Sequence, residues 1–219
     1  MKKFALLLIV SVISFQAFSQ RKPKIKGNKN VIEVREDLEP FTAIELTDDL
    51  DIVLQKSSQE GYALELDDNL LDVLKFKVDN GVLKISSFYN ITSKRKLDIT
   101  IFFQEIRSVK MLNGKISMKD VISTDRLKVH TSGTSRLELN ATADIIDITM
   151  EEISSGDFNL ASDSLNVILK DRIDVKLYTT GANNSLYMYE NASAKVEGTA
   201  DILMAKLYGN SSLKASDLE

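Results

Sequence analysis

The sequence predicts an all-β protein, a single-stranded parallel β-helix (β-solenoid) with coils of about 19 residues. Apolar residues recur every 19 positions in the second half of the chain, and they alternate with polar residues inside each copy. Gly, Ser, Asn and Asp separate these alternating runs. Since period-two alternation indicates strands with one buried face, each copy contributes two short strands and gains a core only by stacking on its neighbours.

The 19-residue columns are the strongest signal for this fold. The regular copies extend from about 108 to 219, and further columns begin at Leu112, Met118 and Leu139. One column consists of Val129, Ile148, Val167, Leu186 and Ala205. Stacking at about 4.8 Å places each column directly above itself. We therefore expect the first four residues of that column to form a single interior file.

Two further columns fall in the turns. Gly114, Gly133 and Gly209 share one of them with acidic residues, and glycine there permits a positive φ. The other consists of Asp125, Asp144, Asp163 and Asp201. An Asp side chain can accept a backbone N–H and close an Asx turn. The alternative is a calcium ladder, but calcium-binding solenoids supply more ligands per turn with a Gly-rich spacing that is absent here. We favour turn capping and predict no metal or cofactor.

Residues 31–107 are also rich in strands but less regular. Asn80-Gly81 lies between two alternating runs and predicts a tight hairpin. Residues 97–103 form another alternating strand that leads into the repeats. Because the end of a solenoid exposes unpaired strand edges, we expect this region to cap the stack or to form irregular early coils. No Pro-rich or Ser-rich linker divides the halves, so 31–219 is predicted to be one domain.

The N-terminus is typical of a secretory signal peptide. Two lysines precede an apolar run at 4–13, and Ala17-Phe18-Ser19 offers small residues for cleavage, so 1–19 is the predicted signal peptide. The apolar run is about half the length that spans a bilayer. Residues 20–30, rich in Lys and Arg, are expected to be a basic flexible linker. We expect a secreted, periplasmic or envelope protein with no stable membrane insertion after cleavage.

Composition argues against most catalytic chemistry. The chain has no Cys and one His, so disulfides, thiolate metal sites and thiol nucleophiles are excluded, and a His-based proton relay lacks most of its parts. The net charge of −4 gives no general attraction to nucleic acid.

Several segments together resemble a known family. They are PFTAIELTDDLDIVLQKSS (40–58), the segment 67–86, KLDITIFF (96–103) and the Ser-Gly corners between strands. The pattern is similar to the putative auto-transporter adhesin head domain, called the GIN domain, of Bacteroidetes envelopes, and the resemblance covers about 31–219. The family's Leu-Ser-Gly-Ser-Gly corners are present only in part, as at 131–135. The resemblance implies a β-helical fold and an adhesive or surface role, with no catalytic residues.

Two functions are consistent with these observations. The first is a non-catalytic, adhesin-like module that presents an extended solenoid face to a glycan or a surface protein. Its candidate binding surface consists of outward aromatic residues: Tyr178, Tyr187, Tyr189 and Tyr208. Tyr189 and Tyr208 are one repeat apart, so they can stack to grip a partner, or, as we favour, to stabilise adjacent coils. Self-association through the solenoid ends is a further expectation.

The second function is a polysaccharide-active enzyme, a lyase or glycosidase, that uses surface carboxylates. Glycoside cleavage needs two carboxyl groups roughly 5–10 Å apart. Acidic pairs such as Glu151 and Glu152 are plentiful, but charge runs of this kind usually form solvated faces. His130 is adjacent to the inward position Val129 and should point outward. We expect the protein not to be an enzyme.

Overall fold

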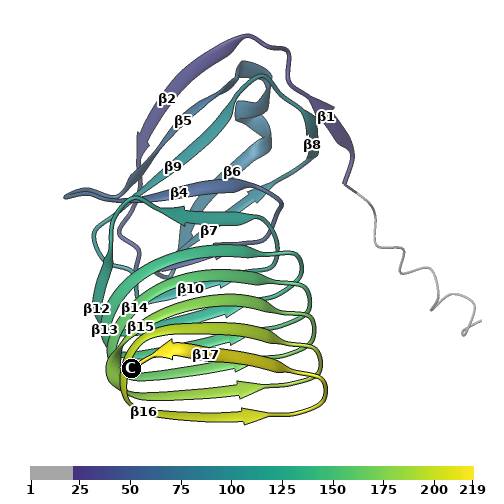
Figure 1. The fold of residues 1–219 in the computed structure, drawn as a ribbon. Helices are drawn as coiled ribbons and strands as arrows, with labels where there is room; N and C mark the ends of the chain where they lie inside the picture. Colours follow the sequence, from purple (N-terminus) through teal and green to yellow (C-terminus); the bar gives the residue numbers. More distant parts are fainter. Residues whose placement is uncertain (1–21) are drawn as a thin grey trace, which may run out of the picture.

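The computed structural model describes residues 22–219, so the predicted signal peptide at 1–19 lies outside the described residues. Figure 1 shows a stack of coils built from the C-terminal half, with the N-terminal half across its upper end. Within 22–219 almost every element is a strand, and the one helix is the short 3₁₀ helix η1 (Asp68–Val73). No helix of this part is long and apolar enough to cross a membrane.

The regular coils are formed by long strands that bend once and pair in parallel with the coils above and below. They are β12 (Ile122–Thr131), β13 (Arg136–Met150), β14 (Ser155–Leu169), β15 (Asp174–Met188) and β16 (Ser193–Leu207). The shorter β17 (Ser212–Leu218) pairs with the first part of β16. In β13 the bend falls at residue 144, which is skipped in the pairing with β14. We call the part before the bend leg A (136–143 in β13) and the part after it leg B (145–150), and use the same names for the other coils.

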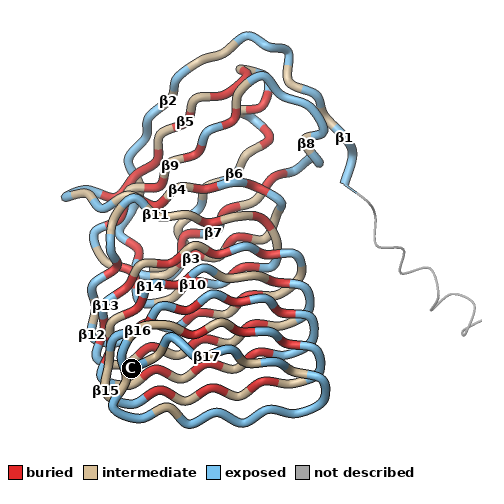
Figure 2. Tube along the Cα trace, in the orientation of Figure 1, coloured by how far each residue is buried: buried red, intermediate tan, exposed pale blue. Residues whose placement is uncertain are grey.

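The interior file predicted from the repeat is confirmed. Val129 pairs with Ile148, Ile148 with Val167, and Val167 with Leu186, and each of the four is at most 3% exposed. Buried and more exposed residues alternate along the coils from β12 to β15 and along the first part of β16, so the core forms a continuous column inside the stack (Figure 2). The β-solenoid with 19-residue spacing is therefore the fold of this chain.

The predicted register of the first copy is wrong. The 19-residue period predicts that Leu112 pairs with Thr131 and Met118 with Leu137. In the structure Thr131 pairs with Met111 instead, and Leu137 pairs with Ile116. Extra residues in the turns of this coil displace the pairing to steps of 20 and 21, and the regular spacing begins only at β12. Leu112 is consequently 37% exposed, not inside the core.

The first half of the chain is less regular, as expected. Its strands are β2 (Val31–Asp37), β3 (Ala43–Leu46), β4 (Asp51–Lys56), β5 (Gly61–Asp67), β6 (Leu74–Asp79), β7 (Val82–Ser87), β9 (Leu97–Phe103), β10 (Ser108–Met111) and β11 (Lys115–Met118). Stacking order departs from chain order here. The coil of β3 and β4 lies between the later strands β7 and β9 on one side and β10 and β11 on the other.

Antiparallel strands and η1 close the upper end of the core. β2 pairs with β5 and β5 with β9, while η1 buries Leu70 and Val73. The predicted hairpin is confirmed: β6 and β7 are antiparallel, and Asn80 and Gly81 have φ values of 51° and 74°. Positive φ at both central residues is the geometry of a type I′ turn.

The prediction of a flexible linker at 20–30 is wrong from Lys24 onward. Strand β1 (Lys24–Lys26) pairs in parallel with β8 (Asn90–Ser93), and the Gly27 N–H donates to the Ser93 carbonyl at 2.8 Å. Ile25, between two lysines, packs against the core. Composition identifies this segment as basic and polar, but pairing with β8, the packing of Ile25 and a hydrogen bond from the Asn69 side chain to the Lys26 carbonyl hold it in place.

The glycine-containing turn column keeps a left-handed backbone at every coil. The φ values are positive throughout: Gly114 81°, Gly133 63°, Glu152 65°, Asp171 70°, Glu190 61° and Gly209 68°. For the acidic members this conformation costs about 1–2 kcal/mol each. Two of their carboxylates recover part of it, because Glu152 accepts the Gly133 N–H at 2.8 Å and Asp171 accepts the Glu152 N–H at 3.3 Å.

This turn yields a stability prediction. The Glu190 carboxylate makes no such hydrogen bond within 22–219. Glu190→Gly should therefore stabilise the protein by about 0.5–1 kcal/mol, because the strain that glycine removes exceeds the conformational entropy that glycine loses on folding. The measurement is the urea midpoint of unfolding. Glu152→Gly is the matched control, since it also removes the acceptor for Gly133 and should gain less or lose stability. A lower midpoint for Glu190→Gly contradicts the argument.

Candidate functional site

The outer surface of leg B changes character along the stack. Backbone hydrogen bonds place Lys170 below Glu151, Tyr189 below Lys170 and Tyr208 below Tyr189, because Lys170, Tyr189 and Tyr208 each donate an N–H to the coil above. The two lower members of this column stack. The ring centroids of Tyr189 and Tyr208 are 4.9 Å apart, and their planes are 7° from parallel. The ring separation therefore matches the rise of one coil, about 4.8 Å.

A third tyrosine lies beside this stack. Tyr187 is two residues before Tyr189, on the same outer side of leg B, and it pairs with Lys206 of the next coil. The Lys206 ammonium nitrogen is 5.4 Å from the centroid of the Tyr187 ring, a cation–π contact. We call Tyr187, Tyr189 and Tyr208 the tyrosine cluster. Tyr208 remains 49% exposed despite its stacking, so the cluster presents aromatic surface to solvent.

Tyr178 does not belong to the cluster. It lies on leg A, between Asn159 and Glu197 of the neighbouring coils, and is 50% exposed. The structure thus brings together three of the four predicted tyrosines and separates the fourth. Residue 182 lies at the bend of this coil. Tyr178 precedes it and so falls on leg A, whereas Tyr187 and Tyr189 follow it and fall on leg B.

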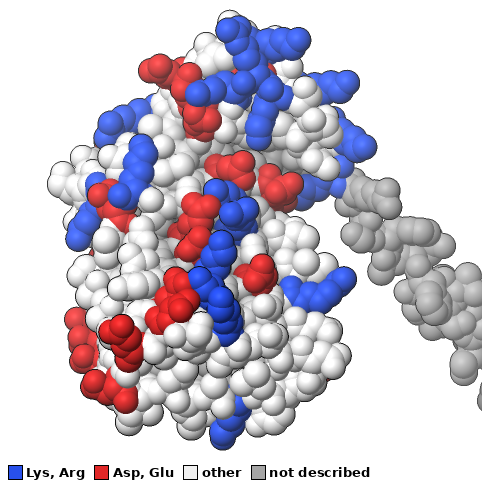
Figure 3. Space-filling model, in the orientation of Figure 1, with Lys and Arg blue, Asp and Glu red and all other residues white. Residues whose placement is uncertain are grey.

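Ion pairs occupy leg B above the tyrosine cluster. Glu151 accepts a hydrogen bond from Lys170 at 2.8 Å, which lowers the pKa of Glu151 and raises that of Lys170. His130 points outward, as predicted, with Nε2 3.8 Å from Glu151. Lys110 and Glu45 form a further pair at 2.8 Å. Figure 3 shows basic and acidic groups intermingled over much of one face, while the left edge of the lower coils carries acidic groups only.

The aspartate column lies at the bend between the legs. Asp125, Asp144, Asp163 and Asp201 are all exposed there. The predicted Asx turns are wrong: within 22–219 no backbone N–H donates to any of the four carboxylates, because the chain stays paired with neighbouring coils on both sides of the bend and has no turn to close. In the same part of the chain, no group of acidic or His side chains has an arrangement that would hold a metal ion.

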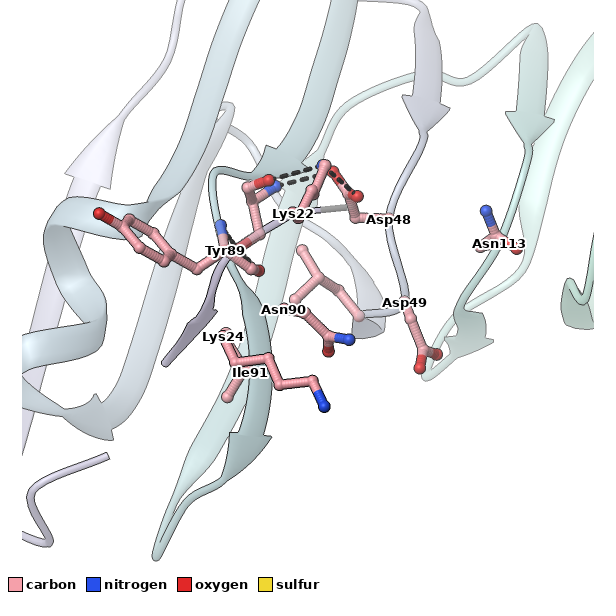
Figure 4. Close-up of a pocket in the computed structure, with 10 residues that line it drawn as sticks. Lys22, Lys24, Asp48, Asp49, Tyr89, Asn90, Ile91 and Asn113 are labelled. Atoms are coloured by element: carbon pink, nitrogen blue, oxygen red, sulfur yellow. Dashed lines mark hydrogen bonds and ion pairs between the residues drawn. The ribbon is translucent and has the colours of Figure 1, made fainter. Parts of the chain in front are cut away.

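A cleft of about 520 Å³ separates strand β1 from the turns of the first coils. Figure 4 shows Lys24 and Asn90 on one side of it, with Asp49 and Asn113 on the other. Lys22 closes one wall through an ion pair with Asp48 and a hydrogen bond to the Ser87 carbonyl at 2.7 Å. Sequence patterns missed this cleft, because it depends on β1 pairing with a strand more than sixty residues away.

The carboxyl groups with shifted pKa values point to structural roles. Within 22–219 all of them are shifted downward by hydrogen bonds or ion pairs: Asp67, Asp68, Asp79, Glu105 and Glu151. A glycosidase acid needs the opposite shift, since it must hold a proton near neutral pH. None of these five groups therefore has the upward shift that the acid of the enzymatic alternative would need.

Asp67 is the most buried of these groups. Burial raises its pKa, but N–H groups of Arg95, Lys29 and Lys96, each 3.1 Å from a carboxylate oxygen, outweigh burial and hold the pKa below its usual value. The carboxylate therefore joins the loop before β2 to the loop before β9. No sequence pattern singled it out, because its partners are backbone groups that are distant along the chain.

The chain matches one family of known proteins. The family described as "Putative auto-transporter adhesin, head GIN domain" matches residues 40–161. Among curated proteins, no sequence matches this chain.

Solved structures share the fold at low sequence identity. A putative adhesin from Bacteroides fragilis has a TM-score of 0.60 at 14% identity, with 87% of this chain and 99% of that chain covered. A putative adhesin from Parabacteroides merdae has a TM-score of 0.56 at 13% identity, covering 89% and 100%. A putative lipid binding protein from Parabacteroides distasonis has a TM-score of 0.55 at 14% identity, covering 88% and 100%.

The buried carboxylate of Asp67 predicts a pH-dependent stability difference. A depressed pKa in the folded state means that Asp67 stabilises the protein above its unfolded pKa, about 3.9, and that this contribution is lost as pH falls through the folded pKa. Asp67→Asn should therefore lower the urea midpoint at pH 7, and its difference from wild type should shrink at acidic pH. Asp157→Asn, at an exposed position, is the control. A difference that does not depend on pH contradicts this role.

The tyrosine stack predicts a coupling energy. In a double-mutant cycle with Tyr189→Ala and Tyr208→Ala, stacking should appear as a coupling of about 0.5–1.5 kcal/mol in the free energy of unfolding. Tyr178→Ala combined with Tyr208→Ala is the matched control and should be additive, since Tyr178 lies on leg A. Additivity within error for the Tyr189 and Tyr208 pair would show that the stack contributes no stability.

Proposed function

Because the chain belongs to the family of putative auto-transporter adhesin head GIN domains, we propose that it is a non-catalytic, adhesin-like binding module of the cell envelope or secreted space. The leg B face presents the binding surface to a glycan or a surface protein. The partner approaches from outside the solenoid, because the interior is filled with apolar side chains.

The exposure of the tyrosine cluster is the observation that carries this proposal. Tyrosine offers a large apolar ring with a polar tip, and such residues are enriched at binding hot spots. The ring faces between Tyr189 and Tyr208 are occupied by stacking, so a partner meets the outer face of Tyr208, the ring edges and the hydroxyl groups. Met204, 40% exposed and two residues before Lys206, extends the surface with apolar area.

The charge pattern supports a protein or neutral glycan rather than a polyanion. Lys170 and Lys206, the two cations beside the cluster, are engaged with Glu151 and the Tyr187 ring. The acidic edge at the bend disfavours anionic partners further. Enzymatic cleavage has weaker support, since the shifted carboxyl groups described above favour the ionised form.

Binding measurements with the purified protein test the proposal. Immobilised glycans and extracellular matrix proteins serve as probes, and the protein should bind at least one of them. Tyr208→Ala and Tyr187→Ala should each weaken that binding at least tenfold, about 1.4 kcal/mol. Tyr178→Ala is the matched control, a tyrosine of similar exposure on the other leg, and should bind like wild type.

Two results would contradict the proposal. Equal binding by wild type and both cluster variants excludes the tyrosine cluster as the site, and binding to no probe contradicts the adhesin-like role. Melting temperatures of all variants separate lost binding from lost folding. Turnover of a polysaccharide, abolished by one carboxylate substitution, would establish the enzymatic alternative.

A further inference from the structure

The chain leaves the stack of coils after β7. β7 pairs with β3, but the following strand β8 pairs within 22–219 with β1 alone. The ribbon of β1 and β8 therefore stands beside the turn between β3 and β4 (47–50) and does not stack on it. The cleft of about 520 Å³ described above lies between this ribbon and the turn (Figure 4). Its size is within the range of small-molecule sites, about 300–1,000 Å³.

Hydrogen bonds of the chain itself fix the walls of the cleft. The Ser87 N–H donates to the Asp48 carboxylate at 2.9 Å, which joins the end of β7 to the turn. In the next coil, the Asn113 amide donates to the Thr47 carbonyl at 3.3 Å and accepts the Thr134 hydroxyl at 3.0 Å. Both walls are therefore held in place before any ligand arrives, as is usual for small-molecule sites.

Three polar side chains of the cleft have no partner within 22–219. Lys24 and Asn90 are paired residues of β1 and β8, and Asp49 lies in the turn; the side chains of all three are exposed and make no hydrogen bond or ion pair with described residues. Figure 4 shows the polar ends of Lys24 and Asn90 directed across the cleft toward the side that carries Asp49. The cleft thus contains an ammonium that only donates, a carboxylate that only accepts, and an amide that does both.

The charges of the cleft balance. Lys22 forms an ion pair with Asp48, and the unpaired Lys24 and Asp49 contribute one charge of each sign. A lining without net charge gives no attraction to a polyanion or a polycation. A hydroxyl group, in contrast, both donates and accepts, so a ligand with several hydroxyl groups satisfies donors and acceptors on the two walls at once.

We propose that this cleft binds a neutral sugar unit, a pyranose with hydroxyl groups on adjacent carbon atoms. One hydroxyl donates to the Asp49 carboxylate, and a second accepts from the Lys24 ammonium or the Asn90 amide. Leu50 and Ile91 also line the cleft and provide apolar contact for the C–H groups of the ring. Few polar groups on a partly apolar lining is the usual composition of a small-molecule site.

A sugar fits this cleft better than a free amino acid, the other neutral ligand with polar groups. An amino acid has both of its charges on one carbon atom, whereas a pyranose has hydroxyl groups around the edge of the ring. Since Lys24 and Asn90 lie on the side opposite Asp49, the ring reaches both sides. None of the lining residues belongs to the tyrosine cluster, so the cleft is a second site and does not depend on the proposed function.

Titrations followed by NMR test the proposal. Isotope-labelled protein is titrated with glucose, galactose, mannose and N-acetylglucosamine, and at least one sugar should bind with a dissociation constant below about 10 mM and shift the amide signals of Lys24, Asp49 and Asn90. Asp49→Ala and Asn90→Ala should each raise that constant, Asp49→Ala at least tenfold, because it removes an ionised hydrogen-bond acceptor. Asp51→Ala is the matched control, since Asp51 is exposed and lies outside the cleft, and it should bind like wild type.

Three results overturn the proposal: binding of none of the four sugars, binding of free alanine to the cleft without binding of any sugar, and sugar binding that Asp49→Ala and Asn90→Ala leave unchanged. Tyr208→Ala separates the two sites. It should leave sugar binding at the cleft unchanged, whereas a sugar that Tyr208→Ala releases and Asp49→Ala does not would lie on the tyrosine cluster. The amide spectrum of each variant reports directly whether it is folded.

Discussion

Vertical register between coils is the constraint on which the rest of this structure depends. A single coil cannot bury its own apolar face, so Val129, Ile148, Val167 and Leu186 are buried only because each lies directly above or below the next. A one-residue slip in one leg would turn its interior residues to solvent. Register therefore has to be renewed at every turn, and from β12 to β16 each coil repeats the same 19-residue length.

The left-handed turn column is a consequence of this constraint. Glu152, Asp171 and Glu190 adopt positive φ values at positions where glycine would be unstrained. Strain of about 1–2 kcal/mol per turn is small beside the several buried side chains that each coil aligns. Uniform turn geometry thus prevails over local backbone preference, and register holds without interruption from β12 to β16.

Features that depend on vertical register or on short local patterns could be predicted from the sequence. The interior file, the type I′ hairpin at Asn80-Gly81 and the stacking of Tyr189 on Tyr208 follow from short patterns or from a fixed period, and the structure confirms them. The errors at Leu112 and Met118 arose where turns gain residues while apolar alternation continues, so that the pattern fits two registers.

The remaining features depend on contacts between distant segments. The coil of β3 and β4 is enclosed by strands that follow it in the chain, and β1 is ordered by β8. The backbone partners of Asp67 are likewise remote. Periodicity describes which residues point inward but carries no information about the order in which irregular coils stack. For the same reason, the cleft beside Lys24 and Asp49 had no signal in the sequence.

Register also limits what the outer face can offer a partner. Outer side chains do not determine how coils align, so they are free to differ from coil to coil, and leg B passes from Glu151 and Lys170 to the tyrosine cluster. The rise of the coil nevertheless fixes the spacing of equivalent side chains, which is why the rings of Tyr189 and Tyr208 are 4.9 Å apart and face each other. The ring faces of Tyr189 and Tyr208 that contact each other are not accessible to a partner. Recognition on this solenoid must therefore use the last ring of a stack and the edges of the others.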